Sequence, residues 1–190
     1  MRRYVVTGAP GAGKTTLLEA LRLRGFAVVR EAATDVITAG QAAGVDEPWT
    51  ASDFFDDILR LQVQRQGEAP AAAVVLFDRS PICTLALTRY AGQPAPARLV
   101  EEVDRLVSEA SYERRVLLVR PLGFIVATAV RRISHTDALA FEAIHEATYR
   151  ELGFDLVEVA PDTVDHRVAA VESMLGGART TGETDARHGD

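Results

Sequence analysis

Residues 8–15 read Gly-Ala-Pro-Gly-Ala-Gly-Lys-Thr and match the phosphate-binding loop pattern G-x-x-x-x-G-K-[ST] at every fixed position. The four residues before the loop, 4–7, are apolar or β-branched and predict a short buried strand. Residues 16–24 have helical spacing, and Gly25 stands where a helix commonly ends. The pattern is specific when a strand precedes it and a helix follows it, so the sequence predicts a nucleoside triphosphate site.

The residue types in this loop suit the binding of phosphate. Glycine lets the backbone take a positive φ and approach a phosphate closely, and amides at a helix N-terminus attract anionic oxygens. We expect Lys14, the only lysine among 21 basic residues, to reach the β- and γ-phosphates of ATP, and Thr15 to bind Mg²⁺. A glycine-rich turn without a ligand is the alternative, which the complete motif disfavours. The expected nucleotide contacts are Gly8, Ala9, Pro10, Gly11, Ala12, Gly13, Lys14, Thr15 and Thr16.

The bulk composition predicts one globular domain. A chain of 190 residues, 47% apolar and 25% charged, is long enough for one hydrophobic core, which we assign to residues 1–175. The small and polar residues 176–190 predict a disordered tail. A net charge of −6 argues against sequence-independent binding of nucleic acid, which needs a basic face.

The cysteine content and the hydropathy pattern bear on localisation. The single cysteine, Cys83, excludes an internal disulfide and suits a reducing compartment, and the apolar run around it predicts a core position. The sequence contains no signal peptide pattern and no apolar run long enough to span a membrane. We therefore expect a cytoplasmic protein that has no membrane partner.

Apolar strand-like runs alternate with helical segments along the whole chain. This alternation predicts an α/β fold with a doubly wound, five-stranded parallel sheet. Polar residues alternate through the fifth strand, which predicts a more exposed place in the sheet. Ser52 and Asp137 are expected to cap helices that run to about residues 66 and 152. The strands are expected at residues 4–7, 26–30, 73–77, 115–120 and 154–159, and an apolar stripe on the closing helix at Val164, Val168, Val171 and Leu175.

Two carboxylates follow predicted strands and should therefore reach the ligand crevice, which lies at the carboxyl ends of parallel strands. Glu31 ends the second strand and is a candidate base that aligns and deprotonates an attacking hydroxyl; an ordinary interaction with a helix dipole is the alternative. Asp78 ends the third strand and is a candidate Mg²⁺ ligand, with helix capping as the alternative. Asp35, one helical turn after Glu31, is a weaker candidate for the same pocket.

Three arginines are candidates for binding phosphate or the acceptor. Arg79, beside Asp78, could bind either group or be a plain surface residue. Arg131 and Arg132 lie in an irregular segment, 121–136, which could close as a lid and neutralise charge on the transferred phosphoryl group; a solvated basic pair is the alternative. Arg120, at the end of the fourth strand, is a weaker candidate.

Histidines and aromatic residues give weaker signals. The four histidines have no metal-site spacing, and His145 is expected on a helix surface. Trp49, Phe54 and Phe55 could stack on a flat acceptor, although a core role is favoured for the two phenylalanines.

With these residues in place, the chain resembles small phosphate-loop ATPases or kinases that are related to the kinase domain of bacterial nicotinamide riboside kinase. The resemblance implies that Glu31 acts as the base and that the Asp78–Arg79 pair holds substrate. The segment 121–130 is more apolar than a polar lid of this group. The stretches that carry the resemblance are TGAPGAGKTTLLEAL, GFAVVREAA, VVLFDRS and YRELGFDLVEV.

The sequence therefore favours a kinase that uses ATP and Mg²⁺ to phosphorylate a hydroxyl on a small molecule, with a nucleoside as one candidate. Residues 32–72 are expected to form the acceptor pocket. The alternatives are an ATPase or nucleotide switch acting on a protein partner, and a nucleotide-binding module without catalysis. A GTPase is disfavoured because the guanine-specific N-K-x-D motif is missing. The sequence fixes neither the acceptor nor the oligomeric state.

Overall fold

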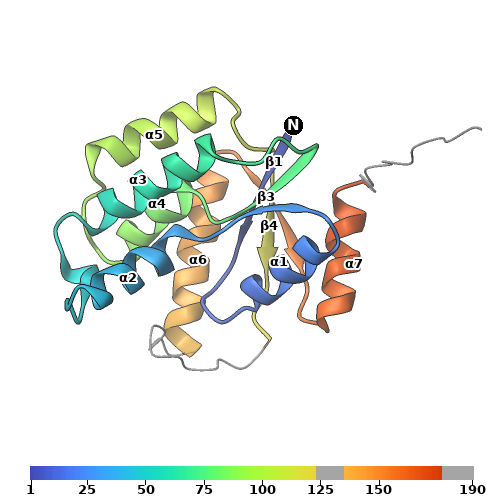
Figure 1. Ribbon diagram of the computed structural model, residues 1–190, viewed down its shortest axis with the longest axis horizontal. Coiled ribbons are helices and arrows are strands. Elements are labelled where there is room, and N and C mark those ends of the chain that lie inside the picture. The colour runs from blue at the N-terminus through green and yellow to red at the C-terminus, as the bar shows by residue number, and fades with distance from the viewer. Residues whose placement is uncertain (123–134, 177–190) are drawn as a thin grey trace, which may run out of the picture.

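A five-stranded parallel sheet forms the centre of the computed structural model, which describes residues 1–122 and 135–176 (Figure 1). The strand order is β2-β3-β1-β4-β5, so the strand that leads into the phosphate loop is the central one. All four neighbouring pairs are parallel, which confirms the predicted sheet. The strands are β1 (Arg2–Thr7), β2 (Ala27–Val29), β3 (Val74–Asp78), β4 (Arg115–Val119) and β5 (Asp155–Val159).

Helices cover both faces of the sheet, as expected for a doubly wound fold (Figure 1). Helices α1 and α7 pack together over one face, and α3, α4, α5 and α6 pack over the other. The helices are α1 (Lys14–Leu23), α2 (Ala32–Ala42), α3 (Phe54–Gly67), α4 (Pro81–Tyr90), α5 (Ala97–Ser108), α6 (His135–Glu151) and α7 (Val164–Met174), with a 3₁₀ turn, η1 (Pro48–Thr50), before α3.

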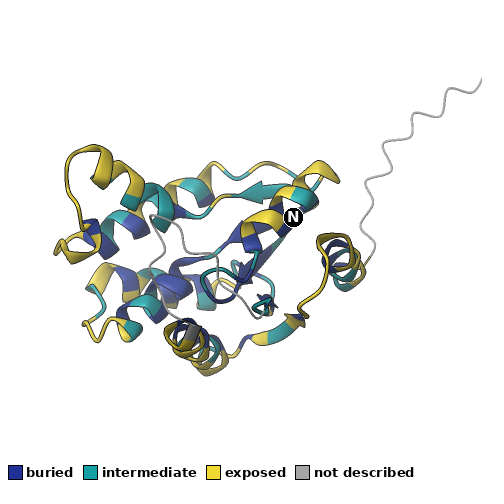
Figure 2. Cartoon of the chain, turned by 90° about the horizontal axis from the view of Figure 1, so that it is seen from below, coloured by how far each residue is buried: buried dark blue, intermediate teal, exposed yellow. Residues whose placement is uncertain are grey.

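The side chains of the central strand alternate between the two cores. Tyr4 and Val6 pack with the leucines of α1 and the valines of α7, whereas Val5 packs with α4, α5 and α6 on the opposite face. Buried residues accordingly concentrate in the strands and on the inward sides of the helices (Figure 2). A strand that is buried on both faces must be apolar at nearly every position, which explains the short continuous run before the phosphate loop.

Some predicted boundaries and exposures differ from the structure. Helix α3 begins at Phe54 after Asp53, so Ser52 is not its N-cap, and α6 begins at His135, two residues before Asp137. The edge strand β5 is partly exposed, as predicted. The stripe on α7 is buried from Val168 onward, but Val164, at the first position of α7, is exposed.

Two predicted segments lie largely or wholly outside the described residues. They are the lid around Arg131 and Arg132 and the tail after Gly176. Among the residues that the structure describes, no helix is both long and apolar enough to cross a membrane.

Candidate active site

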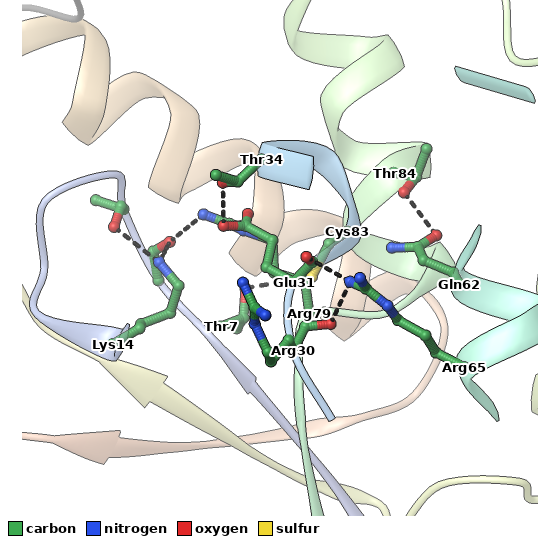
Figure 3. A network of polar contacts seen from close by, with 12 residues as sticks. Thr7, Lys14, Arg30, Glu31, Thr34, Gln62, Arg65, Arg79, Cys83 and Thr84 are labelled. Carbon is green, nitrogen blue, oxygen red and sulfur yellow. Dashed lines mark hydrogen bonds and ion pairs between the residues drawn. The ribbon is translucent and has the colours of Figure 1, made fainter. Parts of the chain in front are cut away.

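The phosphate loop links the end of β1 to the first turn of α1 at the centre of the sheet. Lys14 is the first residue of α1 and is only 5% exposed. Its Nζ donates hydrogen bonds to the carbonyls of Gly8 and Ala9, each at 3.2 Å (Figure 3). The ammonium group therefore lies against the first two residues of the loop. Thr15 and Thr16 are exposed in the same first helical turn. The loop therefore places a buried ammonium beside exposed hydroxyls, as a phosphate site requires.

Any side chain at position 8 would require the backbone of β4 to move. Its φ is +140°, and a Cβ added there would lie 2.3 Å from the carbonyl oxygen of Val119 in β4. We expect Gly8→Ala to lower the free energy of unfolding by roughly 4 kcal/mol or to prevent folding, because strain and a backbone clash add. Urea denaturation measures the effect.

Gly25→Ala is the matched control for this substitution. Gly25 has a similar positive φ of +92° but nothing within 4 Å of the added Cβ. We expect this variant to lose only about 1 kcal/mol from backbone strain. Equal losses in the two variants would mean that the close approach of Gly8 to β4 has no energetic importance.

Glu31 and Arg79 form an ion pair beside the phosphate loop. Arg79 Nε donates to Glu31 Oε1 at 2.6 Å, and Arg79 Nη2 donates to the Gly8 carbonyl at 3.2 Å (Figure 3). Thr34, in the first turn of α2, donates its hydroxyl to the other carboxylate oxygen of Glu31 at 2.9 Å. Because the Gly8 carbonyl also accepts from Lys14, one chain of contacts joins the predicted base, the predicted arginine and the loop lysine.

The backbone of Arg79 is strained. Its φ is +71°, a left-handed conformation that a residue with a Cβ rarely adopts, and its N–H donates to the Val6 carbonyl at the end of β1. Such strain costs of order 1–3 kcal/mol and persists where the surrounding structure requires it, most often at functional sites. Here it turns the guanidinium from the end of β3 towards the phosphate loop.

The charges of this pair are fixed over the physiological pH range. Burial by itself would raise the pKa of Glu31, but the charges of Arg79 and Lys14 and the hydrogen bonds from Thr34 and Arg79 lower that pKa to about 2. Burial would lower the pKa of Arg79, but the neighbouring carboxylate of Glu31 outweighs burial and raises it above its usual range. Glu31 is therefore a carboxylate and Arg79 a cation at neutral pH.

The two predicted Mg²⁺ ligands offer suitable oxygen donors. Asp78 is the last residue of β3, buried and in register with Val6 of β1, while Thr15 is exposed at the start of α1. Mg²⁺ takes one or two protein oxygens and completes its shell with water and phosphate oxygens, so a hydroxyl and a carboxylate fit it. Within residues 1–122 and 135–176, no cluster of three or more acidic, histidine or cysteine side chains forms a self-contained metal site.

A cavity of about 480 Å³ lies next to the phosphate loop. Its volume is within the range of small-molecule sites. Glu31 and Arg79 lie in its wall together with Trp49 and Phe54, but Asp35 does not line it and pairs instead with Arg65. The lining residues are Pro10, Glu31, Ala33, Thr34, Ile37, Trp49, Phe54, Gln62, Arg79, Cys83, Thr84, Leu87, Tyr90, Asp137, Phe141 and His145. Of the predicted aromatic candidates, Phe55 is buried in the core with Phe54 and does not line the cavity.

Two polar features near the cavity gave no signal in the sequence. Gln62 of α3 accepts a hydrogen bond from Thr84 of α4 at 2.9 Å, and both side chains line the cavity (Figure 3). Arg65, one turn further along α3, donates to the carbonyl of Glu31 at 2.6 Å and to Asp35 at 2.5 Å. Arg65 therefore holds the segment between β2 and α2 that carries the predicted base.

The expectation that His145 lies on a helix surface is wrong. Its side chain is fully buried, its ring stacks on Phe141 with a centroid distance of 3.9 Å, and Nδ1 donates to the Phe141 carbonyl at 2.8 Å. Burial, followed by the charge of Arg79, lowers the pKa of His145 to about 3, so the ring is neutral. Charged and apolar residues are mixed along α6 and do not separate onto two sides of the helix. The side that is buried could therefore not be predicted from the spacing of the apolar residues. Cys83 is buried in the core as predicted and also lines the cavity.

Arg120 organises a cluster of carboxylates from α6 and β5. It pairs with Glu142 at 2.7 Å and also with Glu146 and Glu158. The hydrogen bonds that Arg120 donates, first to Glu158 and then to Glu142 and Glu146, raise its pKa. The buried Glu142 in turn accepts from the N–H of Ala9 at 3.2 Å. The predicted weak candidate Arg120 thus supports the loop through α6 and does not line the main cavity.

The chain matches a protein-family model described as AAA domain over residues 3–167. Its fold is similar to that of a deoxyadenosine kinase from M. mycoides with bound dATP, at a TM-score of 0.54 and 14% identity, covering 91% of this chain and 98% of that one. It is also similar to a NadR protein in complex with NAD and AMP-PNP, at a TM-score of 0.63 and 17% identity, covering 100% of this chain and 52% of that one.

A curated relative is similar in sequence. It is the tRNA modification GTPase MnmE of Rhizorhabdus wittichii, 31% identical over 206 residues that cover 98% of this chain. The chain spans about half of that protein, 46% of its length. The solved structures are less than 25% identical to this chain, so their likeness shows the fold alone.

Proposed function

We propose that this chain, which belongs to the AAA domain family, is a kinase that uses ATP and Mg²⁺ to phosphorylate a hydroxyl group of a small molecule, with a nucleoside as the acceptor class. The family and the P-loop kinase fold support a phosphotransferase or an ATPase. The choice between the two rests on the site.

One observation favours a kinase over an ATPase. The Glu31–Arg79 pair lies in the wall of a cavity large enough for a small molecule, and Pro10 of the phosphate loop lies in the same wall. An acceptor in this cavity would place a hydroxyl between a carboxylate and the phosphate loop, which is the arrangement that phosphoryl transfer needs. An ATPase, in which water attacks the phosphate, would need no cavity of this size beside the loop.

The roles of the residues follow from their charges. Lys14 would leave the carbonyls of Gly8 and Ala9 to bind the β- and γ-phosphates, and Thr15 and Asp78 would hold Mg²⁺, which neutralises charge on the transferred group. Arg79 would stabilise charge near the acceptor while keeping Glu31 ionised. Because the transition state of phosphoryl transfer is loose, these residues act mainly by positioning and by electrostatic stabilisation.

Glu31 would act as an orienting group more than as a strong base. A carboxylate with a pKa of about 2 has little affinity for a proton. In a loose transition state the attacking hydroxyl loses its proton late, so a weak base that accepts its hydrogen bond is sufficient. The hydrogen bond from Thr34 fixes the direction of the carboxylate for this task.

Three features support a nucleoside as the acceptor class. The cavity is walled by the aromatic side chains of Trp49, Phe54 and Phe141, which suit a flat ring. The Gln62–Thr84 pair supplies hydrogen-bonding groups in the same wall. In addition, two proteins of similar fold are described as a deoxyadenosine kinase and as a NadR protein bound to NR.

The likeness to a tRNA modification GTPase favours a second candidate, a nucleotide-driven switch that acts on a partner. Guanine specificity through the N-K-x-D motif needs a lysine outside the phosphate loop, and Lys14 is the only lysine of this chain. A switch would therefore use a different nucleotide or a different means of recognising guanine.

Mass spectrometry of the protein with Mg²⁺, ATP and a pooled panel of nucleosides, vitamins and sugars tests the proposal. A product heavier by one phosphoryl group, absent with Lys14→Ala, would establish the kinase and identify its acceptor. ADP and free phosphate without such a product would refute the kinase and favour the ATPase or switch.

A further inference from the structure

Arg167 reaches the phosphate loop from the far end of the chain. It lies in the first turn of α7, and only 3% of its surface is exposed. Nη1 donates to the carbonyl of Ala12 in the loop at 2.7 Å. Nη2 donates to the carbonyl of Arg120 at 2.5 Å, and Nε donates to the carbonyl of Ala160 at 3.0 Å. One guanidinium thus joins the loop to the segments that follow β4 and β5.

These contacts are unusual for a buried arginine. All three hydrogen bonds go to backbone carbonyls, whereas a buried guanidinium is normally paired with a carboxylate. Burial accordingly lowers the pKa of Arg167. Burying this positive charge is costly. Because the charge touches the phosphate loop, it adds to the electrostatic field that attracts anionic oxygens there.

The contact with Ala12 also determines the direction of the next amide. In a trans peptide the C=O of one residue and the N–H of the following residue point in opposite directions, and the described chain contains no cis peptide. Arg167 lies directly against this peptide, since a Cβ on Gly13 would be 3.2 Å from its Nη1. With the Ala12 carbonyl directed towards Arg167, the Gly13 N–H is directed away from Arg167, as it must be if it is to donate to a phosphate.

We propose that Arg167 is a positioning residue of the phosphate loop, which fixes the Ala12–Gly13 peptide so that the Gly13 N–H donates to a nucleotide phosphate. The inference rests on the nucleotide binding that the proposed function requires. This positioning role needs the forked side chain of arginine. Its three nitrogen atoms reach three carbonyls at once, which the single ammonium of lysine cannot do. The alternative is that Arg167 only anchors α7 to the sheet.

The test compares Arg167→Met, Arg167→Lys and Arg24→Met with the unmodified protein, using ADP as the probe. Arg24 is a matched control, because it follows the last residue of α1, contacts Glu172 of α7, is exposed and does not touch the loop. We measure the dissociation constant of ADP, the thermal midpoint, and the Gly13 amide signal in a ¹⁵N–¹H spectrum with and without ADP. Where phosphoryl transfer is detected, KM for ATP and kcat are measured as well.

We expect Arg167→Met to weaken ADP binding by about tenfold or more, the loss of one hydrogen bond to a charged group, with the ADP-induced shift of the Gly13 signal lost. KM for ATP should rise with a smaller change in kcat. Arg167→Lys should recover part of the affinity, and Arg24→Met should bind ADP like the unmodified protein.

Two results would overturn the inference. A lower thermal midpoint of Arg167→Met with unchanged ADP affinity and an unchanged Gly13 shift would mean that Arg167 only anchors α7. If Arg167→Met does not fold, Arg167→Lys decides by the same two measurements. ADP that fails to bind the unmodified protein would overturn both this inference and the proposed function, whereas ADP binding without any phosphorylated acceptor would refute the kinase alone.

Discussion

Replacing Lys14 by alanine is expected to lower the rate of nucleotide turnover by roughly a thousandfold or more, since the phosphates lose the ammonium of the only lysine in the chain. The fold should survive. Alanine is the best helix former for the first residue of α1, and the Gly8 carbonyl keeps its hydrogen bond from Arg79. The measurement is the rate of ADP formation from ATP with Mg²⁺, together with thermal unfolding.

The control is Arg22→Ala on the same helix. Arg22 is exposed and pairs with Glu19, so its loss removes a similar charge without touching the loop. The chemistry of a single lysine adds a second readout: an amine-directed acyl phosphate of ATP should label Lys14 in preference to the N-terminal amine, and excess ATP should prevent it. Full turnover in Lys14→Ala would overturn the assignment of a nucleotide site to this loop.

Glu31→Gln is expected to lower kcat for phosphoryl transfer by about a hundredfold or more while the affinity for ATP changes by about twofold at most. The amide has the shape of the carboxylate, and its oxygen can still accept from Arg79 Nε, but it bears no charge and takes no proton. Kinetics under saturating acceptor and calorimetric titration of ATP separate the two effects. Glu68→Gln, the same substitution at an exposed position after α3, should change neither.

The pH dependence of stability gives an independent check on Glu31. Its pKa is about 2 in the folded state and about 4.3 in an unfolded chain, so the ion pair stabilises the fold above about pH 4.3 and this contribution is lost as the pH falls towards 2. The thermal midpoint of the unmodified protein should therefore be higher than that of Glu31→Gln at pH 7, and the difference between the two midpoints should be smaller at pH 3.

The binding and kinetic measurements on Glu31→Gln have an outcome that would contradict the assigned role. A parallel loss of ATP binding and catalysis in this variant would make Glu31 a structural residue.

The sequence was sufficient for the sheet and for the phosphate loop because both depend on local patterns. An apolar run that is buried on both faces and a glycine-rich turn each consist of residues adjacent in the sequence, so their positions and order could be predicted. The carboxyl-edge rule then brought Glu31 and Asp78 to the same side of the sheet, where the structure places them near the loop.

The supporting contacts could not be predicted in the same way because they join segments that are distant in the chain. Arg167 meets Ala12 across 155 positions, and Glu142 meets Ala9 across 133. Neither contact leaves a spacing that can be recognised locally. The burial of His145 depends on which side of α6 faces α4, and the mixed composition of α6 does not define that side.

The central position of β1 has a consequence for synthesis of the chain. Arg2 pairs with Val74 and Val6 pairs with Leu117, so the first strand made waits 72 and 111 residues for its partners. At ribosomal rates of about 5–20 residues per second, β1 has both edges unpaired for about 4–14 s, a period in which an apolar strand can associate with other chains. Helix α1 follows β1 directly in the chain and packs on one of its faces, so it is the first element that can cover part of the strand during this period.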